Sequence, residues 1–155
     1  MHDPQAGVAA RDISPQSPLF LVGYPHVERF SQGIHDPLLA TALFLGDGRQ
    51  GIVSIATDLL FVPHGLARAA RAEIAERTGI PPERVMISAS HTHSGPVTNE
   101  MLSWRDDPLV PPPDPGYLEG LRRALVGAAV AAVREARPAE LAATTAPSQI
   151  GRAHV

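Results

Sequence analysis

The stretch LLATALFLGDGRQGIVSIA, residues 38–56, reads as two apolar strands joined by a turn. Leu38 to Leu45 is almost continuously apolar, and Gly51 to Ala56 is nearly so. Gly46-Asp-Gly48 lies between them, and such residues are typical of hairpin turns because glycine adopts left-handed backbone conformations without steric cost. The stretch therefore predicts a β-hairpin. Runs this apolar also predict a sheet that is covered on both faces.

Two helices are predicted outside the hairpin. The first runs from Val62 or Pro63 to Thr78 and is stopped by Gly79, because apolar residues recur on one side of it at helical spacing. These residues are Leu66, Ala70 and Ile74. The second begins with Asp114 as N-cap and Pro115 in the first turn, and runs to Ala136. Its expected buried face consists of Leu118, Leu121, Leu125, Ala128 and Ala132.

Further short strands are predicted over residues 8–13, 19–22, 84–90 and 141–146. Together with the hairpin and the helices they predict an α/β fold, with a mixed sheet of short apolar strands and at least two covering helices. The long segment 97–113, rich in Pro and Asp, is predicted to be a loop that forms part of a pocket rim. Its apolar residues suit either a lipid chain or packing against further protein.

The run SASHTHSGP, residues 88–96, follows a predicted strand and carries two histidines two positions apart. Side chains two residues apart in extended backbone point to the same side, so His91 and His93 are expected to share one face at the strand's carboxyl end. Neutral imidazole is a common zinc ligand, and a catalytic zinc has three protein ligands with an open fourth position. The pattern indicates a metal site completed by ligands from elsewhere. The alternative is that both are ordinary polar residues at a strand end.

The surrounding motifs resemble the neutral and alkaline, non-lysosomal ceramidase family. The resemblance covers residues 8–137 and comprises SHTHSGP after GIPPERV, preceded in the family's order by Asp12-Ile-Ser-Pro15, Gly23-Tyr24, Gly33-Ile-His-Asp-Pro-Leu38 and Asp58-Leu-Leu60. Members of that family are zinc amidohydrolases that cleave the N-acyl bond of ceramide to sphingosine and a fatty acid. The resemblance therefore implies a zinc cofactor and a lipid substrate.

The resemblance also implies roles for individual residues. His91 matches a zinc ligand, and His93 matches a catalytic residue that contacts the reacting group of the substrate. Gly23 and His35 match substrate-binding positions, although His35 is equally well explained by a hydrogen bond to Asp36. The family's remaining ligands, a His, a Glu and a Tyr, lie downstream of this motif. Where the family continues Gly-Pro with Gly-Gly, this chain has Val97-Thr98, which leaves the natural substrate open.

Four other polar residues are weaker candidates. Asp58 either orients a histidine from outside the coordination shell or has a structural role such as capping the following helix, and the structural role is favoured. His26 and His64 are expected on the solvent-exposed surface. Ser94 is not expected to be a nucleophile activated by His93, because adjacent residues in a strand face opposite ways.

Composition limits the remaining functional classes. The chain has 155 residues, a formal net charge of −3 and no cysteine, so it offers neither a basic surface for nucleic acid nor a disulfide framework. No transmembrane segment is expected, because the longest apolar stretch is far below the roughly 20 residues that a membrane span needs. Transient contact with a membrane surface is expected for the full-length protein. The literal N-terminus predicts a cytoplasmic protein, and a lost upstream start would make it secreted or periplasmic.

Residues 1–148 are interpreted as an incomplete N-terminal part of a ceramidase-like catalytic domain. Residues 149–155, QIGRAHV from Gln149, resemble a translated sequencing adapter and are expected to be non-native read-through. The predicted function is that of a zinc-dependent ceramide amidohydrolase, with this chain alone inactive. The alternatives are a non-catalytic domain that retains the fold, and a metallohydrolase acting on another amide or ester.

Overall fold

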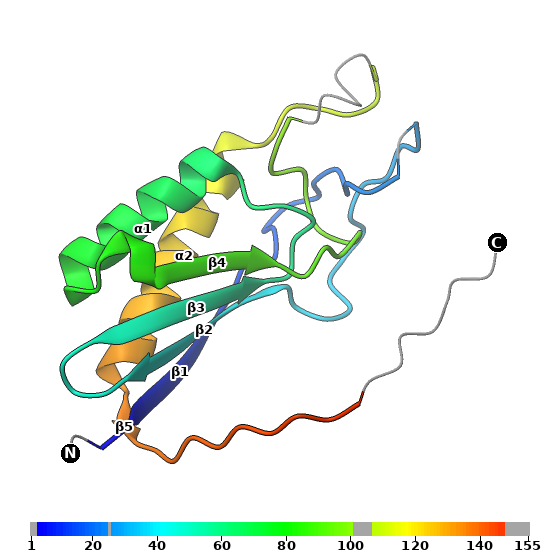
Figure 1. The fold of residues 1–155 in the computed structure, drawn as a ribbon. Helices are drawn as coiled ribbons and strands as arrows, with labels where there is room; N and C mark the ends of the chain where they lie inside the picture. Colours follow the sequence, from blue (N-terminus) through cyan, green and yellow to red (C-terminus); the bar gives the residue numbers. More distant parts are fainter. Residues whose placement is uncertain (1–2, 25, 101–106, 148–155) are drawn as a thin grey trace.

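The computed structural model describes residues 3–24, 26–100 and 107–147 (Figure 1). The predicted end of the native sequence at residue 148, and residues 149–155, which are expected to be read-through, lie outside the described residues. The strands are β1 (Gln5–Asp12), β2 (Leu39–Gly46), β3 (Gly51–Thr57), β4 (Val85–Ala89) and β5 (Arg137–Pro138). The helices are α1 (His64–Thr78), the 3₁₀ turn η1 (Pro82–Arg84) and α2 (Pro115–Arg134).

The strands form one mixed sheet in the order β4-β3-β2-β1-β5. Strands β2 and β3 pair antiparallel from Ala40 opposite Thr57 to Gly46 opposite Gly51, which confirms the predicted hairpin. Strand β4 pairs parallel with β3, so the chain has to cross over between them, and α1 makes this crossing. The α/β class and the mixed sheet with two helices are confirmed. None of the described helices is long and apolar enough to span a bilayer.

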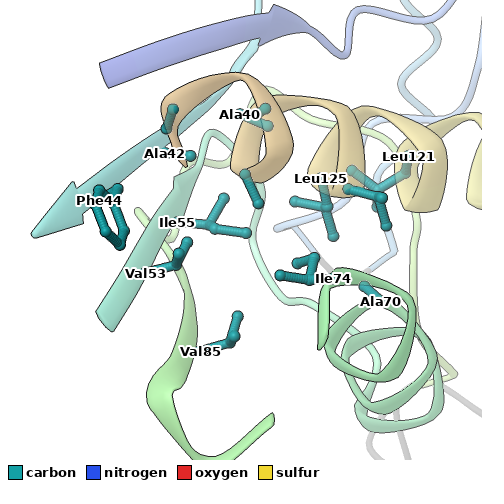
Figure 2. Close-up of a cluster of buried hydrophobic side chains, with 14 of the residues drawn as sticks. Ala40, Ala42, Phe44, Val53, Ile55, Ala70, Ile74, Val85, Leu121 and Leu125 are labelled. Atoms are coloured by element: carbon teal, nitrogen blue, oxygen red, sulfur yellow. The ribbon is translucent and has the colours of Figure 1, made fainter. Parts of the chain in front are cut away.

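The main core lies between the sheet and the two helices, on one face of the sheet only (Figure 2). Ile55, at the centre of β3, and Leu125, on α2, are both fully buried in it. Helix α2 lies so close to β1 that a Cβ built on Gly7 would stand 1.9 Å from the carbonyl oxygen of Ala132. Only glycine leaves room for the helix at this position. Ile74 of α1 fills the space beside α2, as predicted.

The opposite face of the sheet is open in the described part of the chain, which corrects the expectation of a sheet covered on both faces. One row of paired residues crosses β1, β2, β3 and β4 on this face, namely Val8, Leu43, Ser54 and Met86. Val8 is 59% exposed and Met86 57%. The prediction failed because small residues such as Ala42 lengthen the apolar run while only alternate positions face the helices.

Several predicted elements differ from the structure. Residues 141–146 are not a strand, and the last strand is instead the two-residue β5 beside the start of β1. Segment 19–22 forms only isolated bridges, at Phe20 and Leu21. Helix α2 ends at Arg134 rather than Ala136, with Glu135 as its C-cap. Gly79 ends α1 in the left-handed conformation, as expected.

Tyr117, at the start of α2, ties the helix to the end of β1 and leads to a stability prediction. Its hydroxyl donates a 2.9 Å hydrogen bond to the carbonyl oxygen of Ile13. Tyr117→Phe removes that bond and is expected to lower the free energy of unfolding by about 1 kcal/mol, measured by urea titration.

Burial raises the pKa of Tyr117 above its usual range, with a smaller contribution from Asp12. The phenol therefore ionises first in the unfolded chain, so the wild type should lose stability more steeply above a pH of about 10 than Tyr117→Phe does. An identical slope for both proteins would contradict this account.

Candidate functional site

The segment that carries the two histidines continues beyond β4 along an extension of β3. The amide of Ser90 donates to the carbonyl oxygen of Thr57 at 2.9 Å, and the amide of His91 donates to that of Leu59 at 3.0 Å. His91 then adopts a left-handed backbone with φ 64°. Non-glycine residues rarely take this conformation, and it ends the extended path at once. The imidazole pair therefore lies on a turn just past the carboxyl end of β4.

The rings of His91 and His93 lie together despite this turn. Their centroids are 5.4 Å apart with the ring planes at 67°. The pair is continued on both sides by aromatic rings: Phe61 packs edge-on against His91 at 5.2 Å, and Tyr24 packs edge-on against His93 at 5.2 Å. The predicted closeness is present, but the reason given for it was wrong, because the left-handed turn at His91 replaces the extended strand.

The ring of His91 is oriented by the main chain of the neighbouring segment. Its Nδ1 lies 3.2 Å from the carbonyl oxygen of Leu60. A carbonyl oxygen only accepts, so Nδ1 is the donor in this contact, and in the neutral imidazole the lone pair is then on Nε2. Metal-ligating histidines almost always donate their second ring nitrogen in this way. Because His91 is also exposed, its Nε2 is available to a ligand from outside.

Gly23 packs directly against the His93 ring. A Cβ built on Gly23 would stand 2.6 Å from Cγ of His93, and the glycine backbone has φ 133°. Segment 20–24 is held there because the amide of Val22 donates to the carbonyl oxygen of Gly95 and the amide of Val97 donates to that of Phe20. Only glycine fits this position, and the contact is with His93 itself. The predicted substrate-binding role of Gly23 remains a prediction.

A small second apolar cluster joins the segment before Gly23 to the segments on either side of the histidine turn. It consists of Phe20, Val22, Leu60 and Val97, with Phe61 and Val110 packed against it. Thr98 is buried and donates from its hydroxyl to the carbonyl oxygen of Phe61 at 2.7 Å. Thr98 thus fixes the segment that carries the Phe61 ring beside His91.

His35 lies in a groove beside the pair rather than within it. The groove, about 920 Å³ in volume, is lined by segments 14–18 and 30–38 together with Leu21, Asp58, Thr92 and Ser94. His91 and His93 are not among the residues that line it. His35 is 97% exposed and its Nδ1 pairs with Asp36 at 2.8 Å, which is the alternative considered from the sequence.

Asp58 has the structural role that the sequence favoured, but by a different contact. Its carboxylate accepts a hydrogen bond from the amide of Leu39 at 3.0 Å and a weaker one from the hydroxyl of Ser90 at 3.4 Å. It therefore ties the end of β3 to the start of β2 and to the segment before His91. Helix α1 begins after Pro63 without a side-chain cap, so Asp58 does not cap it. His64 is exposed, as expected.

Sequence reasoning missed Asp107, whose carboxylate is buried with 1% of its side chain exposed. It accepts from the amide of His26 at 2.8 Å and from that of Leu109 at 3.0 Å, and it pairs with Nδ1 of His26 at 3.0 Å. These contacts, of which the Leu109 amide contributes most, hold the pKa of Asp107 below its usual range. No local motif could have indicated a pairing across 81 positions. Leu109 is exposed and Val110 half-buried, while the other apolar rim residues, Met101, Leu102 and Trp104, lie outside the described residues.

The donor set fits part of a zinc site. The His91 ring is oriented and the residue is exposed, and His93 supplies a second imidazole nearby. Over residues 3–24, 26–100 and 107–147, no group of three or more His, Cys, Asp or Glu side chains is arranged to hold a metal. The described residues thus suit at most one or two ligands of such a site, and its remaining donors would have to come from outside them.

Solved ceramidase structures share this fold, and no family model matches the chain. A neutral ceramidase from Pseudomonas aeruginosa superposes with a TM-score of 0.75 at 21% identity, over 89% of this chain and 22% of that chain. A ceramidase complexed with C2 superposes with a TM-score of 0.67 at the same identity and coverage. This chain therefore spans about a fifth of the length of either protein. The family resemblance is confirmed at the level of the fold.

Proposed function

We propose that this chain is part of a zinc-dependent amidohydrolase that cleaves the N-acyl bond of ceramide or a closely related lipid amide. The fold shared with solved ceramidases supports the hydrolase class. The observation that carries the proposal is the orientation of His91, whose Nδ1 proton is held by the carbonyl oxygen of Leu60 so that Nε2 is free to bind a metal.

The two imidazoles have different tasks in this proposal. When bound, zinc polarises the amide carbonyl and lowers the pKa of a water molecule that attacks it. His91 contributes one ligand through Nε2. His93, held between Gly23 and Tyr24, donates a hydrogen bond to the developing oxyanion or moves a proton to the leaving amine.

The neighbourhood of the pair supports the choice of a lipid substrate. Phe61 and Tyr24 give the imidazoles an apolar border, and the adjoining groove contains the exposed side chains of Phe30 and Ile34. Such a border suits an amide whose two sides are hydrocarbon rather than a peptide or a polar metabolite. We propose a lipid as the substrate on this basis.

A labelled-ceramide assay tests the proposal on two proteins: the 155-residue chain, and a longer polypeptide that carries it with the ligands expected downstream. The longer protein should release fatty acid, lose that activity in a chelator and regain it with zinc. The 155-residue chain should bind zinc weakly and release none, because one or two ligands do not hold a catalytic zinc.

Each contrary outcome of this assay identifies a different alternative. Turnover by the short chain, or chelator-insensitive turnover by the longer one, would contradict the mechanism. A longer protein that binds no zinc and cleaves nothing would favour a non-catalytic domain that retains the fold. Zinc-dependent cleavage of a short N-acyl amide or ester, with ceramide left intact, would favour a hydrolase of another substrate class.

A further inference from the structure

Arg29 stands on a rigid base beside the imidazole pair. Segments 19–21 and 29–31 run antiparallel: the amide of Leu21 donates to the carbonyl oxygen of Arg29 at 2.7 Å, and the amide of Ser31 donates to that of Leu19 at 2.9 Å. The rings of Phe20 and Phe30 pack edge to face across the same pair of segments at 5.6 Å. The backbone of Arg29 is therefore fixed relative to the wall that carries Gly23 and Tyr24.

The side chain of Arg29 makes two contacts, both directed at the surroundings of His93. One guanidinium nitrogen donates to the carbonyl oxygen of His93 at 3.1 Å. The guanidinium carbon lies 4.7 Å from the centroid of the Tyr24 ring, which is cation–π geometry. Tyr24 in turn packs edge-on against the His93 ring. Arg29 thus holds both the main chain of His93 and the aromatic side chain beside its imidazole.

We infer that Arg29 is the positioning residue for His93, and that it fixes the direction of the imidazole by clamping the turn and the Tyr24 ring at once. The inference rests on the proposed function, in which His93 acts on the reacting group. A planar guanidinium suits the task because it stacks on a ring through its face and donates through its edge, whereas an ammonium does not do both.

The segment before Arg29 has a second attachment, at His26, that does not depend on the Arg29 side chain. Asp107 holds the backbone of His26 through its buried carboxylate, three residues before Arg29 in the chain. Removing the Arg29 side chain therefore releases Tyr24 and the His93 carbonyl while the loop keeps its other attachment. The expected effect is local to the imidazole.

The test is NMR spectroscopy of the imidazoles and of the Tyr24 ring in the 155-residue chain, with His93 assigned through His93→Gln. In Arg29→Met, the cross-peaks between the Tyr24 and His93 rings should be lost and the His93 ring resonances should shift. The His91 Nδ1 and Nε2 shifts should change much less than those of His93, because Leu60 holds the His91 ring and only the ring current from His93 changes there. Arg68→Met, on the exposed side of α1, is the matched control and should change neither histidine.

Arg29→Lys keeps the proposal falsifiable if the methionine variant does not fold. The lysine retains a charge and a donor but not the planar stack, so the Tyr24 cross-peaks should weaken while the turn stays ordered. Wild-type His93 signals in Arg29→Met, or in Arg29→Lys where the methionine variant is unfolded, would overturn the inference. So would equal disturbance of His91 and His93, which would indicate a general structural role. The spectra require neither zinc nor substrate, so a failure of the proposed function would appear only in the ceramide assay.

Discussion

His91→Ala should remove zinc and turnover together, whereas His93→Ala should remove turnover and leave zinc bound. Both variants are made in the longer polypeptide that carries this chain. Nε2 of His91 is the oriented lone pair, so its loss should weaken zinc binding by more than the roughly 10–100-fold that residues outside the coordination shell cost. The ring of His93 rests on Gly23 beside the pair, and its loss should lower kcat by about 10²–10⁴-fold, the usual contribution of an acid–base group.

The measurements are bound zinc per protein and fatty-acid release. His64→Ala is the control, because His64 is exposed in the first turn of α1 and belongs to neither site nor core. Full zinc occupancy in His91→Ala would remove that residue from the metal site. Zinc loss in His93→Ala equal to that in His91→Ala would make both histidines ligands and require another group for proton transfer.

Ile55→Ala should destabilise the fold by about 2–5 kcal/mol, the cost of truncating a large side chain in a packed core. Ile55 is fully buried at the centre of β3, in the same cluster as Leu125 of α2 (Figure 2). The resulting cavity cannot be filled easily, because sheet and helix both border it. The measurement is the free energy of unfolding of the 155-residue chain by urea titration.

Ile52→Ala is the matched control on the same strand. Ile52 faces the open side of the sheet and is 50% exposed, so its truncation should cost less than about 1 kcal/mol. Equal losses for the two isoleucines would show that the open face is covered in solution, and the structural description of that face would then be wrong.

Local patterns were sufficient to predict most of the elements. The hairpin of β2 and β3 follows from two apolar runs with a glycine turn between them, and α1 follows from its spacing and from Gly79. Which residues face the helices could not be read in the same way. Ala40 and Ala42 alternate with Thr41 and Leu43, and apolar character alone does not separate the two faces.

The candidate site was predictable only in its central pair. His91 and His93 stand out because the motif is contiguous, but the left-handed turn that joins them has no signature in the sequence. The contacts that orient them come from Leu60 and Arg29, at separations of 31 and 64 positions. Such partners are set by how the loops pack against one another, and no periodicity in the chain records them.

The left-handed backbone of His91 lowers the stability of the folded chain. Sparsely populated backbone conformations of this kind cost of order 1–3 kcal/mol and persist only where the surroundings enforce them. Glycine would relieve that strain without disturbing the turn, yet it would forfeit the imidazole. Selection for thermal stability alone would therefore favour glycine at this position, whereas histidine keeps the imidazole at the expense of backbone strain.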